Sequence, residues 1–187
     1  MTESFEAKAP TRERLIVAAA RAFRRKGFHG AGLAEILAEA EAPKGSLYHH
    51  FPNGKTDLAL AAADWASEAM AGLIDRSFAP APGWREGVSR LTEKLARLFE
   101  RSDAAEGCPV SGILLEGGDD PARAGRAAAI YESWSRRSAV WLAKRGCPEP
   151  EATAELFLLG LQGAWVLARA RRSADPIRRL PALIFGH

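Results

Sequence analysis

The amino-acid sequence predicts an all-α fold of about nine helices, with an N-terminal unit at residues 1–54 and a C-terminal unit at residues 55–187. Apolar residues recur at the helical spacing in almost every segment, and no segment alternates convincingly as a strand would. Proline, glycine and capping residues separate these segments, as they separate helices. Hydrophobic residues make up 47% and charged residues 26% of the 187-residue chain, which is an ordinary composition for a globular protein.

Three short helices are expected in the N-terminal unit. Thr11 can cap the first helix, which extends to about residue 26 and ends at Gly27. The second helix covers residues 33–40, and after a tight break the third covers Lys44–Phe51 and is closed by Pro52. A longer helix followed by two short ones with a tight break between them is the helix-turn-helix arrangement.

Six more helices are expected in the C-terminal unit, at residues 54–78, 84–101, 110–116, 120–145, 150–172 and 177–185. We expect Asn53 to cap the first of them and Asp120, which precedes a proline, to cap the fourth. The paired glycines at 117–118 end the third, and Ala79–Gly83 is the clearest linker in the chain. The helix at 150–172 is apolar almost all round, so it needs partners on more than one side.

Charge and motif content argue against several function classes. The net charge of +3 permits nucleic-acid binding without demonstrating it. The chain has no phosphate-binding loop, no Gly-x-Ser-x-Gly, no His-Glu-x-x-His and no dinucleotide fingerprint, which argues against an enzyme. Cys108 and Cys147 lack metal or redox spacing, so we predict neither a metal nor another cofactor. The longest apolar run, Leu156–Ala168, is too short to span a bilayer, and residues 1–10 lack the apolar core of a signal peptide. We therefore expect a cytoplasmic protein that does not bind a membrane.

The third helix carries the residues that suit DNA. Leu47 and Phe51 lie four residues apart and are expected to pack inward. The residues left facing outward are Lys44, Gly45, Ser46, Tyr48 and His49. Lys44 supplies a positive charge, and Gly45 lets the DNA come close to the backbone. Ser46, Tyr48 and His49 supply hydrogen-bond donors, which suit phosphates and base edges. Lys55 adds a cation near the positive end of the next helix.

Interpretations of the same region other than DNA binding stay open. The third helix could be a solvated segment of an unrelated bundle, because fold elements do not by themselves imply function. A zinc site at His49 and His50 is disfavoured, since neighbouring side chains on a helix diverge by about 100°. Arg12 and Arg14, near the start of the first helix, either face solvent or touch phosphate.

At these residues the sequence resembles the TetR family of repressors. The stretch Gly27–His29 and the run Ala42–Lys55, which reads APKGSLYHHFPNGK, follow that family's signature in order and spacing. The resemblance is specific over roughly residues 11–60, and Gly107–Val110 is similar to a branch containing LmrA- and YxaF-like regulators. The resemblance implies a DNA-binding domain at residues 1–54 and a helical ligand-binding and dimerisation domain at residues 55–187. The residues implied to contact DNA are Lys44, Ser46, Tyr48, His49 and Lys55.

Two departures from the family pattern bear on DNA affinity. Ala31 and Gly32 stand where the family usually has Thr or Ser before its second helix, and Pro43 stands where Ser is common. A missing hydroxyl cap costs roughly 0.5–2 kcal/mol and here also removes a phosphate contact that the family often makes. We therefore expect a modest affinity for the operator.

The C-terminal unit is expected to contain a cavity for an apolar small molecule. Five tryptophans, most of them on the long helices, fit such a cavity, although most of the five are expected to belong to the core. The residues expected to line the cavity are Trp65, Leu95, Phe99, Cys108, Leu114, Trp134, Gln162 and Trp165. Gln162 is alone in an apolar stretch and is expected to be hydrogen-bonded where buried, either to the ligand or to protein.

The last two long helices are expected to pair with their copies across a two-fold axis. The predicted interface residues are Trp141, Leu156, Leu159, Gly160, Gly163 and Leu167, with the two glycines permitting close approach. The resemblance then implies a homodimeric repressor that binds near-palindromic double-stranded operator DNA and is released by an apolar effector. In that mechanism the helix at 54–78 swings and changes the separation of the two recognition helices, about 34 Å on the operator. Activation instead of repression stays open. The alternatives from other classes are an all-helical enzyme or small-molecule-binding protein without DNA binding, and a scaffold.

Overall fold

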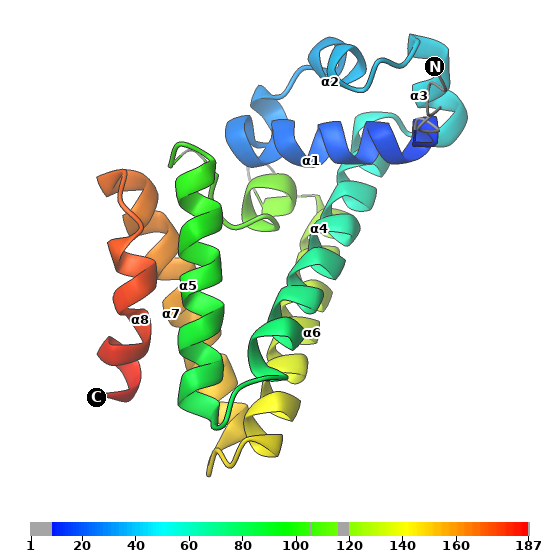
Figure 1. Cartoon of the computed structure of the whole chain (residues 1–187). Helices are drawn as coiled ribbons and strands as arrows, with labels where there is room; N and C mark the ends of the chain where they lie inside the picture. The colour runs from blue at the N-terminus through cyan, green and yellow to red at the C-terminus, as the bar shows by residue number, and fades with distance from the viewer. Residues whose placement is uncertain (1–8, 105, 116–119, 187) are drawn as a thin grey trace, which may run out of the picture.

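The computed structural model describes residues 9–104, 106–115 and 120–186, and all regular structure within these ranges is helical. The elements are α1 (Thr11–Gly30), α2 (Leu33–Glu39), α3 (Lys44–His50), α4 (Lys55–Phe78), α5 (Trp84–Arg101), η1 (Ser111–Leu115), α6 (Pro121–Lys144), α7 (Pro150–Arg171) and α8 (Asp175–Phe185) (Figure 1). The short element η1 is a single π-helical segment. The predicted all-α fold and the predicted order of its helices are confirmed.

The helices α1, α2 and α3 lie together at one end of the molecule, and the remaining helices extend away from them (Figure 1). α1 packs on α4 and on η1, which ties this end to the rest of the chain. A single cluster of buried apolar residues continues from Phe23 of α1 through Leu58 of α4 to Ile177 of α8. The predicted boundary at 54/55 falls at the start of α4, inside this continuous core, and the division into two domains stays a prediction.

Two predicted helix caps are wrong. Pro10 occupies the cap position of α1, Thr11 is already helical, and no side chain caps this end. At the start of α4 the cap position belongs to Gly54, whose φ of 62° favours glycine, and not to Asn53. The carboxylate of Asp57 reaches back instead and accepts a hydrogen bond from the backbone N–H of Asn53 at 2.9 Å.

The predicted cap of α6 is confirmed. The Asp120 carboxylate accepts hydrogen bonds from the backbone N–H groups of Ala122 at 3.0 Å and Arg123 at 3.3 Å. It also accepts one at 2.9 Å from Nε of Arg123, so the cap holds a cation at the start of the helix. The segment 116–118, predicted to end the preceding helix, lies outside the described residues.

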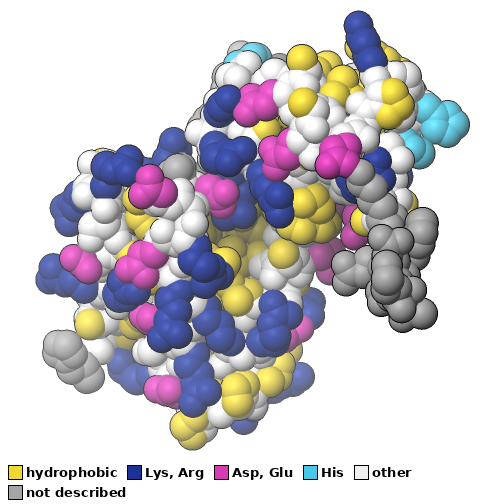
Figure 2. Space-filling view, turned by 45° about the horizontal axis from the view of Figure 1, so that its top comes forward, with side chains coloured by type: hydrophobic (Ala, Val, Ile, Leu, Met, Phe, Trp, Pro, Cys, Tyr) yellow, Lys and Arg dark blue, Asp and Glu magenta, His cyan; other side chains and the backbone are white. Residues whose placement is uncertain are grey.

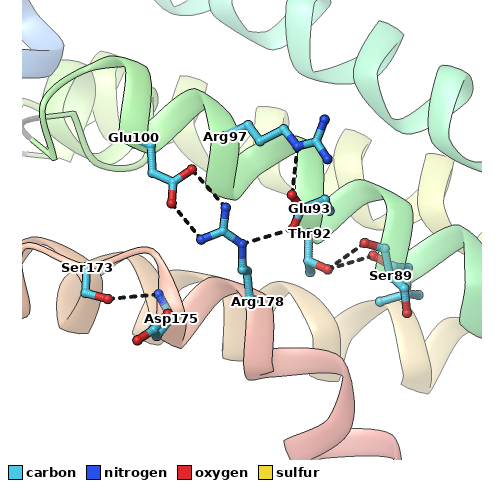
Figure 3. Close-up of polar contacts among 9 residues, drawn as sticks. Ser89, Thr92, Glu93, Arg97, Glu100, Ser173, Asp175 and Arg178 are labelled. Carbon is cyan, nitrogen blue, oxygen red and sulfur yellow. Dashed lines mark hydrogen bonds and ion pairs between the residues drawn. The ribbon is translucent and has the colours of Figure 1, made fainter.

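A cluster of charged side chains fixes α8 against α5 (Figure 3). Arg178 donates two hydrogen bonds to the carboxylate of Glu100, at 2.6 and 2.8 Å, and one to Glu93 at 3.0 Å. Hydrogen bonds from Arg97 and Arg178 hold the pKa of Glu93 below its usual value, and the Arg178 fork does the same for Glu100. The contacts of Arg178 with Glu93 and Glu100 thus join one side of α5 to α8. Another side of α5 faces α4 and a cavity.

Candidate functional site

The α3 helix presents a polar face to solvent because its apolar face is held in the core. Leu47 is 1% and Phe51 is 2% exposed, and Ile36 of α2 is fully buried in the same cluster. The predicted DNA-contacting residues Lys44, Gly45, Tyr48 and His49 are exposed, and Ser46 is half-buried. The structure thus brings these five residues together on one short exposed helix.

The turn between α2 and α3 is fixed by an arginine from α1. Arg14 donates through Nε to the carbonyl of Ala40 at 2.9 Å and through Nη2 to the carbonyl of Glu41 at 3.2 Å. Its third hydrogen bond, from Nη1, goes to the carbonyl of Ala9 at 2.8 Å. Arg14 therefore positions the two short helices from within the protein. The guanidinium of Arg12, in contrast, lies 5.5 Å from the centroid of the Phe51 ring.

Two cations meet one aromatic ring where the start of α4 approaches α1 and α6. The ammonium group of Lys55 lies 4.9 Å and the guanidinium carbon of Arg123 lies 4.1 Å from the centroid of the Phe28 ring. Burial lowers the pKa of Lys55. Lys55 was expected from sequence, whereas the roles of Phe28 and Arg123 were not. A signal existed for Arg123, since an arginine three residues after a capping aspartate can bind its carboxylate.

A cavity of about 570 Å³ opens between α4 and α5. This volume suits a drug-sized molecule. Four of the predicted ligand-binding residues line it: Trp65, Leu95, Phe99 and Trp165. The other lining residues are Arg24, Ala66, Ala69, Met70, Leu73, Arg76, Lys94, Arg97, Leu98, Arg101, Glu106 and Pro109.

The other four predicted ligand-binding residues lie elsewhere. Cys108 and Gln162 line a second hollow, which shares only Trp165 with the first. Trp134 is buried and donates its indole N–H to the hydroxyl of Ser67 at 3.1 Å. Leu114, 2% exposed, belongs to the main core.

The second hollow contains a thiol, a phenol and an unpaired amide. The Cys108 thiol and the Tyr131 hydroxyl are 3.5 Å apart, and burial, followed by the proximity of Cys108, raises the pKa of Tyr131. Nε2 of Gln162 is buried and has no hydrogen-bond partner among the described residues. The hydrogen bond expected for this nitrogen is therefore missing from that part of the chain.

Basic residues around the first cavity are the feature that the sequence analysis missed. Five of its lining residues are cationic, namely Arg24, Arg76, Lys94, Arg97 and Arg101, and one, Glu106, is acidic. Lys94, Arg97 and Arg101 recur at spacings of three and four, which places them on one side of a helix. This spacing was the available signal.

Apolar side chains are exposed along one side of α7. Leu156, Leu159, Val166 and Leu167 are 46%, 65%, 68% and 46% exposed, and a Cβ at Gly163 would meet no atom within 4 Å. Four of the six predicted interface residues therefore lie on this open face.

The other two predicted interface residues make contacts within the chain. A Cβ at Gly160 would come within 2.8 Å of Cδ1 of Leu180, so this glycine makes room for α8. The indole N–H of Trp141 donates to Asp75 on α4 at 2.8 Å, and its ring stacks on Phe78.

Comparison with known proteins identifies the family. The model of the N-terminal domain of bacterial regulatory proteins of the tetR family matches residues 15–62, and the model described as "Transcriptional regulator LmrA/YxaF-like, C-terminal domain" matches residues 85–182. The chain belongs to the TetR family of transcriptional regulators. This confirms the predicted family and its branch. It also confirms the prediction that the protein is a helix-turn-helix transcriptional regulator and not an enzyme.

Individual relatives agree over nearly the whole chain. An HTH-type transcriptional regulator of Mycobacterium tuberculosis (strain H37Rv) is 35% identical over 89% of this chain and 88% of its own length. The HTH-type transcriptional regulator LmrA of Bacillus subtilis is 29% identical over 93% of this chain and 94% of its own. The crystal structure of the regulatory protein TetR from Rhodobacter sphaeroides superposes with a TM-score of 0.81 at 29% identity, covering 94% of this chain and 97% of that one.

The described residues contain neither a candidate membrane span nor a candidate metal site. No helix in that part of the TetR-family chain is long and apolar enough to cross a bilayer. Nor do three or more His, Cys, Asp or Glu side chains gather there in a group that could hold a metal ion.

Proposed function

We propose that this TetR-family regulator is a repressor that binds a near-palindromic operator as a homodimer through α3 and is released by a small molecule. The observation that carries the proposal is α3, whose apolar side is buried while its cationic and hydrogen-bonding side chains are exposed. A helix of this kind enters the major groove by its N-terminal end. Lys44 stands at that end, as the first residue of α3.

Each exposed residue of α3 has a role in this mechanism. Lys44, Tyr48 and His49 contact phosphates, and Ser46 contacts a phosphate or a base edge. A Cβ at Gly45 would meet no atom within 4 Å, so the fold itself does not require glycine there. In this mechanism the DNA backbone approaches Gly45 closely, and this approach explains why the position has no side chain.

The exposed face of α7 supports the homodimer. Leu159 and Val166 are about two-thirds exposed, and they flank the open position at Gly163. An apolar helix face of this kind is buried when two copies pack α7 against each other across a two-fold axis. The dimer then presents two α3 helices to successive major-groove faces, about 34 Å apart.

Two helices connect the cavity to the DNA-binding end. α4 begins beside Phe28 with Lys55 and lines the cavity further along with Trp65, Met70 and Leu73. α1 contributes Arg24 directly to the cavity wall, where it forms an ion pair with Glu106 at 2.9 Å. A molecule that binds one arrangement of α1 and α4 better than another shifts the separation of the two α3 helices, and only by that difference in affinity.

The test is a titration of the purified protein onto the DNA upstream of its own gene, with random duplex as competitor, at about 50 mM and about 200 mM salt. We expect competitor-resistant binding with a steep salt dependence. Binding of wild-type protein that equals binding to random DNA, and that Lys44→Ala leaves unchanged, would contradict the proposal. A reporter placed behind this DNA should increase in expression when the regulator is deleted, and a decrease would indicate an activator.

A further inference from the structure

The cavity between α4 and α5 is apolar inside and basic around its opening. Figure 2 shows it as a hollow with hydrophobic side chains at its base and Lys and Arg side chains around it. The apolar part is formed by Trp65, Met70, Leu73, Phe99 and Trp165. A purely apolar ligand would use this part and would leave the basic residues unused.

The charges around the opening are unbalanced. Arg24 is paired with Glu106 at 2.9 Å, and Arg97 is paired with Glu93 at 2.7 Å. Arg76, Lys94 and Arg101 form no ion pair with any described residue. Three cations of one cavity therefore have no ion-pair partner within the described chain, although Arg76 also attracts the neighbouring carboxylate of Asp75.

Two of these cations are held close together. Nζ of Lys94 donates a hydrogen bond to the backbone carbonyl of Arg76 at 2.7 Å, near the C-terminal end of α4. Burial, followed by repulsion from Arg76 and Arg90, lowers the pKa of Lys94. Like charges held together in this way repel each other, and a bound anion relieves that repulsion. Arg24 also keeps an unused donor in this cavity, since its Nε is buried and has no hydrogen-bond partner among the described residues, while its Nη2 pairs with Glu106.

We infer that the effector is an amphipathic anion, whose aromatic or aliphatic body fills the apolar part of the cavity and whose single acidic group lies against Arg76 and Lys94. This inference rests on the proposed function, because it takes this cavity as the effector site of the repressor. It revises the effector expected from the sequence, which was apolar throughout. A carboxylate or a sulfonate provides the required charge, and charge-assisted hydrogen bonds to arginine favour both.

DNA phosphates do not account for the same cations. The cavity opens between α4 and α5, whereas the exposed face of α3 lies at the far end of α4 (Figure 1). A duplex bound along α3 therefore leaves the cavity cations without phosphate partners.

The test compares two dyes that share one aromatic body. Anilinonaphthalene sulfonate carries a sulfonate, N-phenylnaphthylamine carries no charge, and both fluoresce when they enter an apolar site. We expect wild-type protein to bind the sulfonate at least tenfold more tightly than the neutral dye at low salt, and to lose part of this preference at high salt. In competition, decanoate should displace the neutral dye at lower concentrations than decanol.

The variants Arg76→Gln and Lys94→Gln are each expected to weaken sulfonate binding about threefold to tenfold, because each removes one charged contact. Binding of the neutral dye should change less than twofold, which also shows that the cavity is still folded. The matched control is Arg136→Gln, since Arg136 lies on α6 outside the cavity lining and pairs with Glu132. Arg136→Gln should bind both dyes as wild type does.

Equal affinity of wild-type protein for the two dyes would overturn the inference. So would a double variant at Arg76 and Lys94 that keeps its preference for the sulfonate, or one that loses both dyes in parallel. Operator binding is measured separately on wild-type protein without dye. Specific DNA binding without anion preference leaves the proposed repressor standing and overturns only the anionic effector. Anion preference without specific DNA binding leaves an anion-binding cavity standing and overturns the proposed repressor.

Discussion

Replacement of Gly87 by alanine is expected to destabilise the protein, although alanine is the better helix former. Gly87 lies in α5, and a Cβ there would come within 2.3 Å of Cδ1 of Phe78. Phe78 has little room to move, because it is 1% exposed and its ring stacks on Trp141 with 6.4 Å between centroids. We take the cost of overpacking as about 3 kcal/mol, the upper end of the usual range. The gain in helix propensity offsets about 1 kcal/mol, so the free energy of unfolding should fall by about 2 kcal/mol.

Thermal unfolding at one fixed protein concentration measures this effect. For a chain of this size, about 2 kcal/mol corresponds to a lowering of Tm by roughly 4–8 °C. Gly125→Ala is the control, because Gly125 also lies inside a helix but a Cβ there would meet no atom within 4 Å. The control should raise Tm by roughly 1–4 °C. A Gly87→Ala protein as stable as wild type would refute the tight packing of α5 on α4 at Phe78.

Three further predictions concern DNA binding, assembly and pH. Lys44→Ala removes one phosphate contact per protomer, so the slope of log affinity against log salt concentration should become shallower by about 1.8 for the dimer. Arg90→Ala is the control and should leave this slope unchanged. An unchanged slope for Lys44→Ala would contradict the role of Lys44 in phosphate binding. Leu159→Glu places a charge on a residue that is 65% exposed on α7 and should give monomers in light scattering, whereas Tyr48→Glu, outside that face, should stay dimeric. A dimeric Leu159→Glu protein would exclude this interface. The Asp75 carboxyl, which joins α4 to α6, has its pKa lowered from 3.8 to about 2, chiefly by the hydrogen bond from Arg137. Its contribution to stability is therefore complete above pH 3.8 and is lost as the pH falls through about 2. Because this pair is partly exposed, we expect no more than about 1 kcal/mol in urea unfolding, and a wild-type advantage over Asp75→Asn that is independent of pH would contradict it.

Helix positions were predictable because their signals are local. Asp120 before Pro121 began α6 as expected, and the break at Gly27 appears in the structure as a positive φ of 71°. The failures at Thr11 and Asn53 have the same local origin. A hydroxyl or amide side chain suggests a cap, but the residues at the cap positions are Pro10 at the start of α1 and Gly54 at the start of α4.

The face of α3 was predictable because it follows from helical spacing, whereas the cavity depends on how distant helices meet. Leu47 and Phe51 had to be buried together, and this fixed which neighbours face outward. Trp134 and Trp165 both lie on long helices, yet only Trp165 lines the cavity between α4 and α5. Three cations of that cavity, Lys94, Arg97 and Arg101, share one side of α5, but α1 and α4 supply the other two, so the spacing on α5 alone does not show that the charges surround a cavity.

In the proposed mechanism, the arrangement around Phe28 gives α1, and not α4 alone, a part in transmitting the effector signal. Arg24 lies four residues before Phe28 on α1, on the other side of the break at Gly27, and its partner Glu106 also lines the cavity. The ring of Phe28 contacts the cations at the starts of α4 and α6, Lys55 and Arg123. In that mechanism an anion bound at Arg76 and Lys94 would also weaken the attraction between Arg24 and Glu106 in the same cavity, and a resulting shift of α1 would reach Phe28 across the break at Gly27. Because α1 also holds the turn between α2 and α3 through Arg14, its displacement would move α3 directly. The proposed effector and the position of α3 would then be coupled through α1, by contacts that are all present in the protein before the effector binds.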